Sequence, residues 1–210
     1  MRKLILLVAC ITAILGKAQE MKMGVKAGVN IASLRGGEDN NVVQLYKLPV
    51  NTKSQMEVKA GVYFGAYLEK TISDKGSAVG EAIFTFQGAR KIDHISVNYE
   101  NIAKALGYSV SGRTSINIIQ LNMPVYYKYE IFNKLFLNAG GYVGFIIGSN
   151  VNGLSISNNT IDLGLLAGTA YQLSDNLSAE VRYNFGLFDI SDVAPYKNSV
   201  FQIGVNYKLK

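Results

Sequence analysis

The sequence is poor in the residues that most often hold metals or form disulfides. Its 210 residues include one cysteine, Cys10, one histidine, His94, and no tryptophan. If Cys10 is removed with the N-terminal segment, the rest of the chain can form neither a disulfide nor a thiolate metal site. A zinc site is also disfavoured, because structural zinc is held by several cysteine or histidine ligands. We therefore predict no metal ion and no cofactor.

Charge is sparse as well. Aspartate, glutamate, lysine and arginine make up 17% of the chain, with a formal net charge of +6. Arg2, Lys3 and Lys17 lie in a segment that we expect to be removed, which leaves 18 basic side chains against 15 acidic ones. This excess is too small and too evenly scattered to indicate a nucleic-acid partner.

After residue 19 no apolar run is long enough for a membrane-spanning helix, which needs about 20 residues. Before it, a basic start, an apolar stretch at residues 4–15 and the small-x-small triplet Gly16-Lys17-Ala18 predict a cleaved signal peptide, residues 1–18. Two alternatives are disfavoured. An uncleaved anchor would need a longer apolar run, and lipidation at Cys10 would leave only nine residues before the cysteine. Residues 19–210 are expected to form one domain.

The feature that dominates the sequence is a two-residue alternation of apolar and polar side chains. It is clearest from Ile119 to Ile147, where two alternating runs flank a short connection at residues 132–134. Such a period indicates a long β-hairpin whose two faces differ. Alternating segments occur at residues 24–31, 58–69, 81–87, 119–129, 135–147, 161–172, 177–187 and 201–209.

Short and long connections alternate between these eight segments. Short turns are expected at residues 73–76, 132–134 and 174–176, and long polar loops at residues 35–55, 92–113, 149–159 and 189–198. An even number of strands with both termini at the short-turn end is typical of outer-membrane barrels. We therefore predict an all-β fold, an eight-stranded antiparallel up-and-down transmembrane β-barrel, with four long external loops.

The composition of the two faces indicates which face lies inside. The polar face is rich in glycine, at positions 24, 28, 61, 65, 140, 144, 164, 168, 186 and 204. The narrow interior of an eight-stranded barrel has room for few large side chains, whereas a solvated strand face gains nothing from glycine. The apolar face carries aromatic residues towards the strand ends, where lipid headgroups would lie: Tyr127, Tyr129, Tyr171, Tyr183, Phe185 and Tyr207. A soluble barrel with an apolar interior is the alternative that we disfavour.

With the polar faces inside, charged side chains of both signs point into the lumen. The candidates for ion pairs there are Lys26, Glu69, Glu81, Lys128, Asp162, Glu180 and Arg182. Lys59 is expected to point inward as well. Unpaired buried charges are costly, so we expect a paired polar plug, in which Glu180 and Arg182 join Lys128 or Glu81. A narrow passive pore is the alternative.

Catalysis has little support. His94 is expected at the rim of the second long loop, with Asp93 and Ser96 beside it. A serine–histidine–acid arrangement there could make an outer-leaflet lipid hydrolase, but such triads are recognised by geometry rather than by adjacency in sequence. We therefore assign no catalytic residue.

Three stretches resemble the PorT-like family of small outer-membrane β-barrels. They are GVKAGVNIASL at residues 24–34, GEAIFTFQGA at residues 80–89, and LNMPVYYKY at residues 121–129 followed by LNAGGYVGFIIG. The resemblance covers the mature chain and implies an eight-stranded barrel in the outer membrane. It implies little about activity, because a fold does not supply a function.

The expected function is that of a small, non-conducting outer-membrane barrel with a structural or interaction role. Its expected partners are outer-membrane lipid and proteins that bind the external loops. We expect a monomer.

Overall fold

The computed structural model describes residues 21–36, 40–45, 48–97, 109–151, 154–155, 161–190 and 196–209. The predicted signal peptide, residues 1–18, lies outside them. The strands are β1 (Met21–Arg35), β2 (Asn40–Leu45), β3 (Leu48–Ser73), β4 (Gly76–Val97), β5 (Ser109–Phe132), β6 (Leu135–Val151), β7 (Leu154–Ser155), β8 (Ile161–Gln172), β9 (Leu177–Gly186) and β10 (Lys197–Lys208). In the part of the chain so described, no helix is long and apolar enough to cross a membrane.

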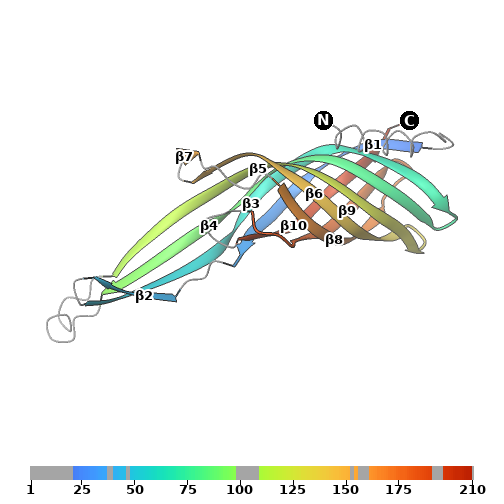
Figure 1. Ribbon diagram of the computed structural model, residues 1–210. Coiled ribbons are helices and arrows are strands. Elements are labelled where there is room, and N and C mark those ends of the chain that lie inside the picture. The colour runs from blue at the N-terminus through green and yellow to red at the C-terminus, as the bar shows by residue number, and fades with distance from the viewer. Residues whose placement is uncertain are drawn as a thin grey trace, which may run out of the picture.

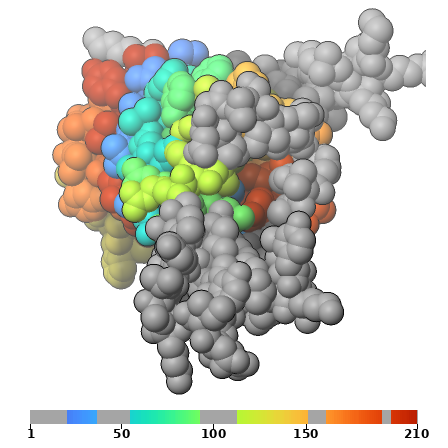
Figure 2. Space-filling view, turned by 90° about the vertical axis from the view of Figure 1, so that its left-hand side faces the viewer, coloured from blue at the N-terminus to red at the C-terminus, as the bar shows by residue number. Residues whose placement is uncertain are grey.

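Eight of these strands close into an antiparallel ring. Its order is β1-β10-β9-β8-β6-β5-β4-β3, and β3 pairs back onto β1 to complete it. Figure 2 looks at the molecule from the end opposite the short turns and shows β1 (blue) between β10 (red) and β3 (cyan). Closure gives every strand a partner on both sides, as a sheet surrounded by lipid requires. The predicted eight-stranded barrel is confirmed.

The short connections all lie at one end of the barrel. β3 and β4 are joined at residues 74–75, β5 and β6 at residues 133–134, and β8 and β9 at residues 173–176. Lys134 adopts a positive φ of 70° in its turn. β1 begins and β10 ends at this same end, where Gly24 pairs with Lys208. At the opposite end, β1, β4, β6 and β9 end and β3, β5, β8 and β10 begin.

At that opposite end, strands occupy much of what the sequence predicted as loop. β4 continues to Val97 and β5 begins at Ser109, so residues 92–97 and 109–113 of the predicted loop at residues 92–113 lie in paired strands. β3 begins at Leu48, and β2 pairs with it inside the predicted loop at residues 35–55. Figure 1 shows β3, β4 and β5 reaching well beyond the rest of the barrel, with β2 at their tip. The loop prediction was wrong for these residues, because an extended hairpin satisfies its backbone polar groups without apolar alternation.

The two faces of the barrel strands lie as the alternation predicted. On β9, Val181 and Tyr183 are about 40% exposed, whereas Glu180 and Arg182 between them are almost fully buried. Aromatic side chains line the outer surface towards the short-turn end: Tyr127, Tyr129, Tyr171 and Tyr207. An apolar band edged by tyrosine is the surface that a transmembrane barrel presents to lipid.

Glycine on the inner face allows the backbones and large side chains to approach one another. At Gly28, an added Cβ would lie 2.6 Å from the Cα of Gly204 and 2.8 Å from the Tyr63 ring. Gly80, which lies between two inward residues, has nothing within 4 Å of the same position. The interior of the ring therefore has no room for more side chains at its glycines.

Two apolar clusters lie inside the barrel. Neither cluster was predicted from the sequence. One contains Leu34, Ala89, Ile118 and Ile190. The other contains Val79, Tyr126, Tyr142 and Leu166. Alternation assigns these residues to the inner face, but it does not show that they meet.

Candidate functional site

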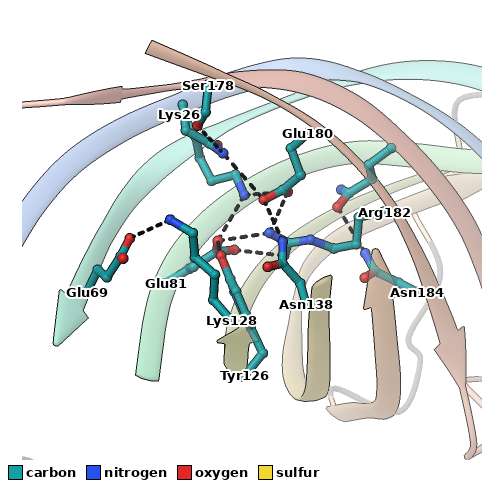
Figure 3. A network of polar contacts seen from close by, with 12 residues as sticks. Lys26, Glu69, Glu81, Tyr126, Lys128, Asn138, Ser178, Glu180, Arg182 and Asn184 are labelled. Atoms are coloured by element: carbon teal, nitrogen blue, oxygen red, sulfur yellow. Dashed lines mark hydrogen bonds and ion pairs between the residues drawn. The ribbon is translucent and has the colours of Figure 1, made fainter. Parts of the chain in front are cut away.

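Four charged side chains meet in the centre of the barrel. Lys26 on β1 lies 2.9 Å from Glu81 on β4 and 2.8 Å from Glu180 on β9. Arg182 on β9 lies 2.8 Å from Glu81 and 2.6 Å from Glu180. Figure 3 shows Lys26 and Arg182 reaching towards the two carboxylates from different strands. We name Lys26, Glu81, Glu180 and Arg182 the central ion cluster.

The arginine holds Glu81 with both arms of its guanidinium. Nη1 donates to one carboxylate oxygen of Glu81 and Nη2 to the other, each at 2.8 Å. Tyr126 donates its hydroxyl to Glu81 at 2.7 Å, and its ring centroid lies 5.0 Å from the guanidinium carbon of Arg182. Bidentate, charge-assisted pairs of this kind are stronger and more directional than neutral hydrogen bonds.

Glycine lies opposite the long side chains of the cluster. Lys26 pairs across the sheet with Gly65, Glu180 with Gly204, and Arg182 with Gly168. Each glycine leaves space on the inner face beside a side chain that has to cross the lumen. This local arrangement explains why the inner face combines glycine with the longest charged residues.

The central ion cluster is balanced in charge and buried. It contains two cations and two carboxylates, and the side chains are at most 2% exposed. Charges withdrawn from water are tolerated when their partners compensate for lost hydration. Asn138 and Asn206 add donors to the second oxygen of Glu180, both at 3.4 Å.

The remaining ion-pair candidates lie apart from this cluster. Lys128 pairs with Glu69 at 2.9 Å, and these side chains are 20% and 13% exposed. They line a cavity of about 240 Å³ at the short-turn end, together with turn residues such as Asp74 and Asp175. Two cross-strand partners were expected for Glu180 and Arg182. Glu81 contacts Arg182 as expected, whereas Lys128 pairs with Glu69 instead. Lys26 takes that place.

Asp162 is held by neutral groups. Its Oδ2 accepts hydrogen bonds from Asn198 at 2.7 Å, Gln120 at 3.0 Å and the Tyr142 hydroxyl at 3.1 Å. Gln87 donates in turn to Gln120 at 2.7 Å. The sequence predicts an ion pair for Asp162, whereas its described partners are neutral. The layer of buried amides was not predicted, because an amide carries no charge that would indicate a partner.

Lys59 does not reach the charged groups of the lumen. Its amino group contacts Ser115 Oγ at 3.0 Å and the side-chain oxygen of Asn117. Ser115 and Asn117 alternate with Ile116 and Ile118, which pack inside the barrel, so they belong to the outer face. A register shift between Val58 and Val62 interrupts the alternation here, and this explains the difference from the expected inward position.

His94 lies in a strand rather than at the rim of a loop. It is part of β4, where it pairs with Lys53 on β3 and Ser111 on β5. Its side chain lies outside the described part of the structure. Among the side chains that are described, no group of three histidine, cysteine, aspartate or glutamate residues could hold a metal ion.

Comparison with known proteins agrees with the eight-stranded ring. Residues 17–192 match a family described as outer membrane protein beta-barrel domain. No curated protein matches the chain. Neisserial surface protein A has a TM-score of 0.58 at 14% identity, and Ail of Yersinia pestis one of 0.52 at 12% identity. Each comparison covers 91% of this chain and 100% of the other. The chain therefore belongs to the outer membrane protein β-barrel domain family and is a small outer-membrane β-barrel.

Proposed function

We propose that this protein is a closed, non-conducting barrel that anchors an external interaction surface in the outer membrane. The observation that carries the proposal is the central ion cluster. Lys26, Glu81, Glu180 and Arg182 cross the lumen from β1, β4 and β9, and their side chains are at most 2% exposed. A hydrated ion passing this point would have to separate paired charges that have little access to water.

Further layers support closure. Towards the long-connection end, Gln120 and Asp162 belong to a buried hydrogen-bonded layer, and beyond it Leu34 and Ile118 belong to an apolar cluster. Towards the short-turn end there is a cavity of about 240 Å³, and a smaller one of about 20 Å³ lies beside Glu81 and Glu180. A volume of about 20 Å³ is enough for one water molecule. The lumen is thus filled in successive layers.

The interaction surface would be the end that carries the longer connections. There β3, β4 and β5 extend beyond the barrel, and β2 pairs with the outer part of β3. The exposed backbone edge of an extended sheet can accept a strand from a partner. We propose that the protein works as a monomer in outer-membrane lipid, with protein partners bound at this end. We include in the same proposal that the protein is a member of the PorT-like family of small outer-membrane barrels.

Conductance measurements test closure directly. Residues 19–210, refolded into detergent and inserted into planar bilayers, should give no steady current. A heat-modifiable gel band and protease protection of the reconstituted barrel establish that folded protein is present in the bilayer. Reproducible open channels from such protein would refute the plug and favour the passive pore.

A further inference from the structure

The mouth of the barrel at the short-turn end contains two cavities with polar walls. The outer cavity has a volume of about 240 Å³ and is lined by residues of all eight barrel strands. The inner cavity, of about 20 Å³, lies beside Glu81 and Glu180 of the central ion cluster. Four residues line both cavities: Tyr67, Glu69, Lys128 and Ser178. The two cavities therefore adjoin each other.

The inner cavity is rich in hydrogen-bond acceptors that lack a donor. Asn138 and Asn206 each direct Nδ2 towards Oε2 of Glu180, at a long distance of 3.4 Å, and each leaves its side-chain oxygen without a partner. The other oxygen of Glu180 is already held by Lys26 and Arg182. A buried oxygen that accepts no hydrogen bond is costly. The inner cavity therefore favours a group that donates hydrogen bonds.

An ammonium group has the donors that the inner cavity needs. It carries three donors and no acceptor, and three acceptors are available: Oε2 of Glu180 and the side-chain oxygens of Asn138 and Asn206. A cavity of about 20 Å³ admits a group of the size of water. A water molecule has two donors and a hydroxyl group has one. The set of acceptors therefore favours an ammonium group.

The outer cavity supplies cations for a negative group. Lys22 on β1 and Lys208 on β10 line it from neighbouring strands, and neither forms an ion pair with a described carboxylate. Lys128, in contrast, is held by Glu69 at 2.9 Å. Lys208 lies two residues beyond Asn206, which is about 7 Å along the strand. A small ligand could therefore reach the two lysines with one end and the inner cavity with the other.

The carboxylates of the outer cavity do not reverse this polarity. Asp74 and Asp175 are exposed in the β3–β4 and β8–β9 turns, where salt and water screen their charge. Glu130 accepts a hydrogen bond from the backbone N–H of Lys134 at 3.3 Å. Because the walls carry charges of both signs, they favour neither a simple anion nor a simple cation. A ligand with both charges suits them better.

We propose that the short-turn mouth binds a zwitterion, either an amino acid or a short peptide with free amino and carboxyl ends. Its ammonium group enters the inner cavity and donates to Glu180, Asn138 and Asn206, and its carboxylate pairs with Lys22 and Lys208. This binding site goes beyond the proposed external interaction surface and lies at the opposite end of the barrel.

The test is calorimetric titration of residues 19–210 folded in neutral detergent. Alanine and the dipeptide alanyl-alanine are titrated separately, and the tighter binder shows whether the ligand is a free amino acid or a peptide. That compound is then compared with its N-acetyl form, which lacks the ammonium group, and with its carboxamide form, which lacks the carboxylate. Each blocked form should bind about 10-fold more weakly, because it loses charge-assisted hydrogen bonds.

Variants assign each end of the ligand to its side chains. Lys22→Gln combined with Lys208→Gln should weaken binding of the free compound about 10-fold but leave binding of the carboxamide unchanged. Asn206→Leu, which keeps the size of the side chain, should weaken binding of the free compound but not of the N-acetyl form. The matched control is Lys70→Gln combined with Lys134→Gln, which removes two cations that do not line either cavity. It should bind as the unaltered protein does.

Three outcomes would overturn the proposal. They are no binding of either compound, which would mean that the cavities hold water only, equal binding of the free and blocked forms, and an equal loss of binding in the control variant. Every variant is first checked for the heat-modifiable band, so that a folding defect is not mistaken for lost binding. Conductance is measured on the same protein. A conducting barrel that still binds the zwitterion would refute closure and leave this site intact, so the two proposals can fail separately.

Discussion

Arg182 offers the sharpest test of the lumen. Its guanidinium is fully buried and contacts both Glu81 and Glu180. Replacing it with methionine keeps much of its volume but leaves two carboxylates facing Lys26 alone. Removing one partner of a buried ion pair costs about 3–5 kcal/mol, because the remaining charge stays buried without compensation. We expect the free energy of unfolding to fall by about that amount in Arg182→Met.

A second substitution shows whether charge is the cause. Glu180→Gln combined with Arg182→Met leaves one cation, Lys26, and one carboxylate, Glu81. The double variant should therefore be more stable than Arg182→Met alone, and the difference measures the coupling between the two positions. Lys128→Met is the control for an ion pair near the short-turn end. That pair is 20% and 13% exposed, so its loss should cost about 1 kcal/mol or less.

The measurement is reversible unfolding in urea, with the protein in lipid vesicles or detergent. Because the chain has no tryptophan, the folded fraction is followed by circular dichroism and by the gel band that shifts on heating. If Arg182→Met unfolds at the same urea concentration and with the same slope as the unaltered protein, the central ion cluster does not stabilise the barrel. The argument for a structural plug would then fail.

Further predictions concern the two faces and the lumen. Val181→Arg places a charge on the lipid-facing side of β9 and should cost about 2–4 kcal/mol in vesicle folding; an unchanged value would contradict the membrane barrel. Gly28→Ala should cost about 1–3 kcal/mol through overpacking, whereas Gly80→Ala, with open space around its Cβ, should be neutral by the same assay. Glu81→Ala should loosen the lumen, and a first measurable conductance in planar bilayers is the expected result.

The barrel strands could be predicted because lipid imposes a strict rule on each of them. Every second residue must be apolar where it meets the bilayer, and this is visible in single segments such as Val62–Leu68 of β3. The same rule ends where the lipid ends. Beyond it, the outer parts of β4 and β5 need only backbone pairing, which leaves no periodic signal, and the sequence therefore predicted loops there.

The contents of the lumen could be predicted only in part. Alternation assigned Lys26, Glu81, Glu180 and Arg182 to the inner face. It could not show which charges meet, because partners depend on the height of each residue and on strands that face each other across the ring. Lys26 and Lys128 both occupy inner-face positions of alternating strands, but they lie at different levels of the barrel. Lys59 shows a second limit, since a register shift in β3 changes the positions that alternation would assign.

The contacts of Lys26 have a consequence for how the barrel forms. Its partner Glu180 is 154 residues away along the chain, and Glu81 is 55 residues away. An open sheet that has not yet joined β1 to β10 would leave Lys26 on β1 and Glu180 on β9 near opposite edges, with both charges still hydrated. The contact between Lys26 and Glu180 therefore forms only once the ring is complete, whereas Glu180 and Arg182 are already neighbours on β9. Closure of the ring is therefore the step after which the hairpins no longer separate one at a time and the barrel unfolds as one cooperative unit.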